Sequence, residues 1–145
     1  MSTARSRPAE TRARTILNRV AGRALPVSET LVLASDLDPV GTVVDDIALF
    51  NDLGLEVARR YGEGTWSWEF ADGVANDLFL LMQGRWKLLE PEGKNFHPTL
   101  FWQVFEAFDG GEYRRKGDDS TVDPVEKYTN PAIADVLQHD WPIDE

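Results

Sequence analysis

The chain has 145 residues, of which 42% are hydrophobic and 28% are charged, and this composition is typical of one folded domain rather than of a disordered chain. It contains no cysteine, which excludes disulfides, thiolate metal sites and cysteine nucleophiles, and no stretch has the roughly 18 consecutive apolar residues of a membrane helix. The formal charge of -10 predicts repulsion from nucleic-acid phosphate and anionic membranes, and attraction of basic partners.

The charge is unevenly distributed along the chain. Residues 1–25 contain six arginines and one glutamate, whereas residues 26–145 contain nine basic and twenty-four acidic residues. We interpret residues 1–8 as a flexible basic arm and residues 9–145 as a single helical domain. Because the chain lacks cysteine and its N-terminal part has no apolar segment of the secretory kind, we expect a cytoplasmic protein.

Hydrophobic residues recur with a period near 3.6 through most of the chain, which predicts an all-α domain of about five or six helices. The first helix is expected over residues 9–25. The residues 31–33 are apolar but too few to assign to a helix or a strand. A second helix is expected from Thr42 to Tyr61, because Thr42 and Asp45 together have the pattern of a capping box.

Caps and glycines mark the middle helices. Thr65 or Ser67 is expected to cap a third helix that ends near residues 82–83, because Gly84 follows. An irregular stretch is expected over residues 86–97. The next helix is expected to begin at Pro98, which suits a first helical turn, and to end at the glycine pair at 110–111.

The same helix-start pattern occurs twice in the C-terminal region. Asp123-Pro124 and Asn130-Pro131 each combine a capping side chain with a proline at the first helical position. This repetition predicts two short C-terminal helices.

Trp102 lies off the apolar face of its own helix. At 100° per residue, the helix after Pro98 gathers its apolar residues on one face and places Trp102 on the polar face with Glu106 and Asp109. Trp102 is therefore either exposed or covered by the N-terminal helix or the C-terminal pair of helices. An exposed aromatic flanked by carboxylates has the composition of a hot spot for a basic partner.

The third helix carries an acidic face that points away from its apolar face, with Leu80 placed among the acids. Together with the residues around Trp102, this face forms the predicted partner-binding surface. Its members are Trp102, Glu106, Asp109, Glu69, Asp72, Asp77 and Leu80.

A metal site is the alternative interpretation of the same acidic face. Glu69 and Asp72 are one turn apart, so their carboxylates can share a hard cation such as Mg²⁺. Over about ten residues this Glu-x-x-Asp pair resembles one half of the metal site of the all-α nucleoside triphosphate pyrophosphohydrolases, in which an earlier helix supplies a Glu-x-x-Glu pair. The earlier helix here has no Glu-x-x-Glu, and its acidic residues are Asp45, Asp46, Asp52 and Glu56. The resemblance implies an Mg²⁺-dependent hydrolase.

No catalytic constellation or cofactor motif is expected elsewhere. His97 and His139 have no serine or cysteine nucleophile pattern near them, so a catalytic triad is not predicted. The glycine pairs lack the lysine and the preceding strand of a phosphate-binding loop. We expect no cofactor.

The favoured hypothesis is a small acidic protein-binding module, either an inhibitor or an immunity or antitoxin-like protein that neutralises a basic partner protein. In size, charge and lack of cysteine the chain is similar to small bacterial immunity proteins. A variant of this hypothesis is mimicry of nucleic acid, in which carboxylates stand in for phosphates. A third hypothesis is a structural or assembly subunit whose arginine-rich arm docks onto an acidic neighbour. Direct nucleic-acid binding and membrane association are not expected, and the oligomeric state stays open.

Overall fold

The computed structural model describes residues 7–23, 30–37, 41–89 and 97–138. Within these ranges the protein is one packed all-α domain, as the sequence predicts. In chain order its elements are α1 (Arg7–Arg23), the short 3₁₀ helix η1 (Ala34–Leu37), α2 (Val43–Gly62), α3 (Trp68–Leu89), α4 (Thr99–Asp109), the π-helical turn η3 (Val125–Thr129) and α5 (Asn130–Gln138). None of the helices in these ranges combines the length and the apolar content that crossing a membrane requires.

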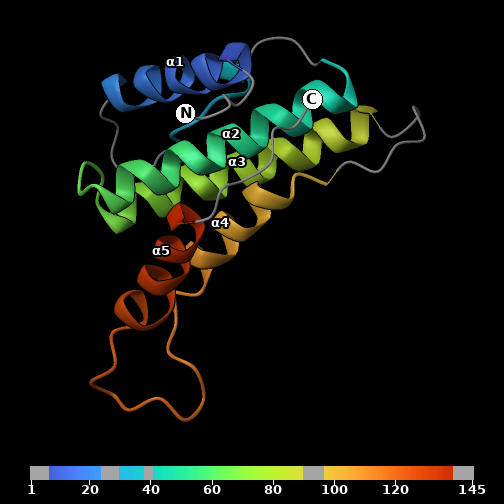
Figure 1. Ribbon diagram of the computed structural model, residues 1–145. Coiled ribbons are helices and arrows are strands. Elements are labelled where there is room, and N and C mark those ends of the chain that lie inside the picture. Colours follow the sequence, from blue (N-terminus) through green and yellow to red (C-terminus); the bar gives the residue numbers. More distant parts are fainter. Residues whose placement is uncertain (1–6, 24–29, 38–40, 90–96, 139–145) are drawn as a thin grey trace.

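Helix α2 is the centre of the domain. It packs against each of the other four α-helices, with α1 on one side and α3 and α4 on the other (Figure 1). More than half of its residues are buried, and Phe50 and Leu53 are fully excluded from solvent. Because α2 is covered on several sides in this way, its buried side chains form the centre of the core.

Two residues of α2 fix the position of α4. A Cβ atom built on Gly54 would lie 3.0 Å from the Cα atom of Phe101, so the missing side chain lets the two helices approach closely. One turn earlier, the side-chain oxygen of the buried Asn51 accepts the backbone N–H of Phe101 at 3.1 Å. Because the first N–H groups of a helix have no partner within the helix, Asn51 satisfies one that would otherwise be buried unpaired.

The predicted starts of α2 and α3 are confirmed, and the predicted end of α3 is wrong. The side chain of Thr42 accepts the N–H of Asp45 at 3.1 Å, and the side chain of Ser67 accepts the N–H of Phe70 at 3.1 Å. However, α3 continues through Gly84 to Leu89, so the expected irregular stretch is helical over residues 86–89. A glycine inside a helix costs only about 1 kcal/mol, and burial of the residues that follow it outweighs that cost.

The two short helices expected at the C-terminus form one continuous helical run. Asp123 accepts the N–H of Val125 at 2.9 Å, as a cap should, and the π-helical turn η3 then leads directly into α5. Although α5 begins at Asn130, the side chain of this residue does not cap a separate helix. Its side-chain oxygen instead accepts the hydroxyl of Tyr61 at 2.5 Å and ties α5 to the end of α2.

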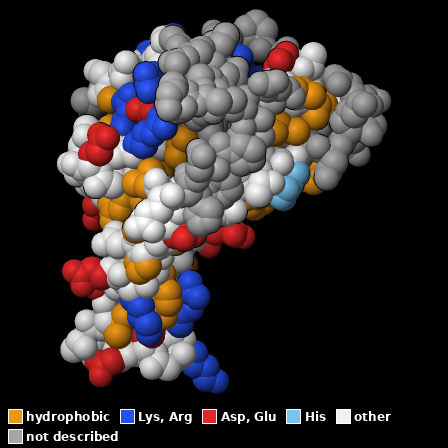
Figure 2. All heavy atoms as spheres, in the orientation of Figure 1, with side chains coloured by type: hydrophobic (Ala, Val, Ile, Leu, Met, Phe, Trp, Pro, Cys, Tyr) orange, Lys and Arg blue, Asp and Glu red, His pale blue; other side chains and the backbone are white. Residues whose placement is uncertain are grey.

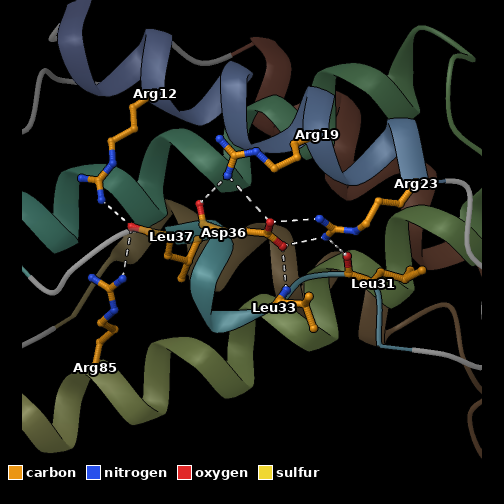
Figure 3. Close-up of polar contacts among 8 residues, drawn as sticks. All are labelled: Arg12, Arg19, Arg23, Leu31, Leu33, Asp36, Leu37 and Arg85. Atoms are coloured by element: carbon orange, nitrogen blue, oxygen red, sulfur yellow. Dashed lines mark hydrogen bonds and ion pairs between the residues drawn. The ribbon is translucent and has the colours of Figure 1, made fainter.

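Arginines of α1 hold the segment that leads to α2, an arrangement we call the arginine clamp (Figure 3). Arg23 donates to both carboxylate oxygens of Asp36 at 3.0 and 2.6 Å and to the carbonyl of Leu31 at 2.8 Å. Arg12 donates to the carbonyl of Leu37 at 2.5 Å. The bond from Arg23 lowers the pKa of Asp36, helped by the N–H of Leu33.

A buried ion pair extends the clamp across the core. Arg85 of α3 donates to both carboxylate oxygens of Asp46 of α2, at 3.1 and 2.9 Å, and also to the carbonyl of Leu37 at 3.2 Å. The side chain of Arg85 is 7% exposed and that of Asp46 is not exposed at all. One guanidinium therefore joins α2, α3 and η1 at a point that water does not reach.

Candidate protein-binding seam between α3 and α4

Trp102 is partly buried, because α3 covers one side of it. Its ring packs edge-on against Phe79 of α3, with ring centroids 5.3 Å apart, and against Phe105 one turn along α4 at 6.0 Å. Phe79 and Phe105 stack face to face at 4.3 Å. The aromatic cover of Trp102 therefore comes from α3, which the sequence did not predict, and part of the residue remains exposed.

A carboxylate cluster lies at the other end of the same pair of helices. Asp72 of α3 is close to Asp109 at the end of α4 and to Glu112 in the turn that follows. Since Phe79 meets the start of α4 and Asp72 meets its end, the two helices run antiparallel. We call the line from Trp102 to Glu112 the α3–α4 seam.

Asp72 is the most perturbed carboxyl group of the seam. Burial first, and then repulsion from Glu112 and Asp109, raise the pKa of Asp72 to about 7. One of its oxygens accepts the side-chain N–H of Asn76 at 3.3 Å, while the other is buried and meets no donor. Burial and the nearby carboxylates of Glu112 and Asp109 therefore favour the protonated form of Asp72 up to about neutral pH.

The middle of the seam is acidic and exposed. Trp102, Glu106 and Asp109 are spaced at four and three residues along α4, so they form one stripe. Glu106 and Asp109 are both exposed. Figure 2 shows acidic side chains gathered over the part of the surface where α4 runs. The structure therefore brings together four of the predicted residues: Trp102, Glu106, Asp109 and Asp72.

The other three predicted residues lie outside the seam. Asp77 accepts the backbone N–H groups of Leu31 and Val32 at 2.6 and 3.2 Å, so its carboxylate holds the clamped segment and does not face solvent freely. Glu69 and Leu80 are exposed on the outer side of α3. Leu80 lines a hollow together with Gln83, Gly84, Trp86 and Lys87.

The acidic residues proposed for a metal site do not converge. Asp46 is paired with the buried Arg85, and Glu56 is bound by Arg59 and Arg60 at 3.3 and 3.1 Å. Among the residues that the structure describes, no group of three or more His, Asp or Glu side chains is placed to hold a metal ion. The pair formed by Glu69 and Asp72 gains no ligand from the earlier helix.

The histidines add one contact to the seam. His97 is exposed and its ring lies roughly parallel to that of Trp102, with centroids 6.0 Å apart. His139 lies outside the described residues.

Sequence reasoning missed Phe79 and Glu112. Phe79 falls beside the apolar face of α3 rather than on it, and an aromatic residue in that position indicates contact with a second neighbouring helix. Glu112 follows the glycine pair at the end of α4, and nothing in its sequence context indicates that the turn brings it to Asp72.

No protein-family model, curated protein or solved structure that we compared matches this chain. Its function therefore has to be inferred from the side chains themselves.

Proposed function

We propose that this protein is a small binding module that inhibits or neutralises a basic protein, and that the α3–α4 seam is its contact surface. The observation that carries the proposal is the fixed ring of Trp102 in line with exposed carboxylates of α4. A tryptophan whose orientation is set by Phe79 and Phe105 loses little conformational entropy when a partner covers it. Such rigid aromatic residues are the commonest anchors of protein interfaces.

The carboxylates determine which kind of partner the seam attracts. Glu106 and Asp109 flank Trp102 along α4, and Asp72 with Glu112 extends the negative charge beyond them. A cleft lined by lysine or arginine would be steered towards this edge before contact and would pair with it after contact. The same charge pattern suits a partner whose natural ligand is a nucleic acid, since carboxylates then occupy the positions of phosphates.

The arginine clamp bears on the assembly-subunit hypothesis. Arg12, Arg19 and Arg23 all contact the chain's own segment 31–37, and Arg14 lies 3.8 Å from Glu56. These arginines therefore bind acidic and carbonyl groups of the same molecule. Their contacts within the chain compete with docking to an acidic neighbour.

Capture from a lysate of the native host tests the proposal when three versions of the protein are compared. The seam variant carries Trp102→Ala, Glu106→Lys and Asp109→Lys, and the control carries Glu63→Lys, an acid that is also exposed, after the end of α2. We expect the wild type and the control to enrich the same basic protein, which is released by raised salt, and the seam variant to lose it. If the seam variant captures the same proteins as the wild type, the proposed contact surface is wrong.

A further inference from the structure

The outward face of α3 carries a second surface, which shares no residue with the seam. Apart from the adjacent pair Gln83 and Gly84, its members are three to four residues apart, so they form one line along the helix, and none of them is buried. We call this line the outer stripe. It consists of Glu69, Gly73, Asn76, Leu80, Gln83, Gly84 and Lys87.

The outer stripe has opposite charges at its two ends. Glu69 lies in the first turn of α3 and Lys87 in its last turn. Their separation is five helical turns at 3.6 residues per turn, so both side chains lie on the same side of the helix, about 27 Å apart. Leu80, which lies between them, is 64% exposed.

Room for a neighbouring helix exists beside Leu80. A Cβ atom built on Gly84 would have no other atom within 4 Å, so the backbone of α3 is open at that position. The hollow around it has a volume of about 610 Å³ and is lined by Leu80, Gln83, Gly84, Trp86 and Lys87. Gly73 precedes Leu80 by seven residues on the same line, so the stripe has a glycine on either side of the leucine.

We propose that a second copy of this chain occupies the outer stripe, with the two α3 helices antiparallel and related by a twofold axis near residue 78. In this arrangement each Glu69 lies opposite the partner subunit's Lys87. The two Leu80 side chains pack together, offset by about 6 Å along the direction of the helices. The stripe is its own electrostatic complement only in the antiparallel orientation. Charge complementarity therefore selects a second copy of the stripe as the occupant.

The dimer is expected to be weak. The proposed contact involves a single helix from each chain, whereas a stable interface needs roughly 1,000 Å² of buried surface, and the overall charge of -10 on each chain opposes association. We expect a dissociation constant on the order of 10–100 μM, within the concentration range of the test below. The proposal is independent of the function assigned to the seam.

Sedimentation velocity of the full chain, from about 5 to about 500 μM at low salt, tests the proposal. We expect the sedimentation coefficient to rise from that of a monomer towards that of a dimer. Leu80→Asp should keep the protein monomeric, because it places two carboxylates at the centre of the interface. Val44→Asp is the matched control, since Val44 is an equally apolar residue, 50% exposed, on α2. It should leave the dimer unchanged.

A charge swap tests the register. Glu69→Lys alone and Lys87→Glu alone should each weaken the dimer about five-fold or more, and the two changes together should restore it, because the opposite charges then face each other again. Circular dichroism verifies that each variant keeps its helices. A wild type that stays monomeric at the highest concentration overturns the proposal. So does a dimer that survives Leu80→Asp, or a double variant that remains as weak as the single ones.

Discussion

The buried pair of Arg85 and Asp46 supplies the most demanding test of the fold. Arg85→Met keeps the length and the apolar part of the side chain but removes the cation. The carboxylate of Asp46, which has no solvent exposure, then loses its two bonds from the guanidinium and keeps only the distant N–H of Gly41 at 3.4 Å.

The cost follows from the burial. Removal of one member of a buried ion pair destabilises a protein by about 3–5 kcal/mol, because the other charge remains without a partner. For a domain of this size such a loss lowers the melting temperature by roughly 10 °C or more. Urea unfolding at pH 7, followed by circular dichroism, measures the change in the free energy of unfolding.

A second variant separates the ion pair from simple loss of packing. Arg85→Met combined with Asp46→Leu removes both charges, so no unpaired carboxylate is left in the core. We expect the double variant to regain at least half of the lost stability, since apolar residues commonly replace buried pairs at little cost. A single variant that costs less than about 1 kcal/mol would refute the burial of this pair as we describe it.

Three further predictions concern single positions. Because the pKa of Asp72 is raised to about 7 in the folded protein, this group contributes stability at low pH that is lost as the pH rises through about 7. Asp72→Asn should therefore be about 1–2 kcal/mol more stable than the wild type at pH 8, and this gain should vanish below about pH 4. Urea unfolding at both pH values checks this prediction. Gly84→Ala should stabilise the monomer by about 0.5–1 kcal/mol in thermal unfolding, because the added methyl group meets no atom. Gly54→Ala should destabilise it by about 1–3 kcal/mol in the same assay, because the methyl group would press against the backbone of Phe101.

Local signals predicted the helices, and long-range burial decided where they end. Thr42 and Ser67 start their helices as their sequence patterns indicate, because a cap acts within three residues. Gly84 does not stop α3, because Arg85 and Leu89 beyond it are buried and bind or pack elsewhere in the domain. No pattern within a single helix reports such contacts.

The sequence predicted the kinds of residue in the candidate site but only part of their arrangement. Helical angles correctly placed Trp102, Glu106 and Asp109 on one stripe, since angles depend on spacing alone. They do not show which neighbouring helix lies beside that stripe, so the contact with Phe79 and the carboxyl pair of Asp72 with Glu112 were missed. Both depend on how α3 and α4 are packed.

The arginine clamp illustrates the same limit for charges. The sequence shows that residues 1–25 are basic, and from this sign alone the arginines appear free to meet another protein. In the structure Arg23 binds Asp36 only thirteen residues away, while Arg12 reaches the carbonyl of Leu37. Net charge thus predicts attraction but does not identify which groups are already paired within the chain.

Binding kinetics with the captured basic protein test the central claim, that the α3–α4 seam is a protein-binding surface. Glu106→Lys with Asp109→Lys should slow association about ten-fold or more at low salt, with the difference fading well above 0.1 M, because rim charges act mainly through steering. Trp102→Ala should instead accelerate dissociation by a factor equivalent to about 2 kcal/mol or more. If both variants associate and dissociate at the wild-type rates while remaining folded, the seam is not the binding surface.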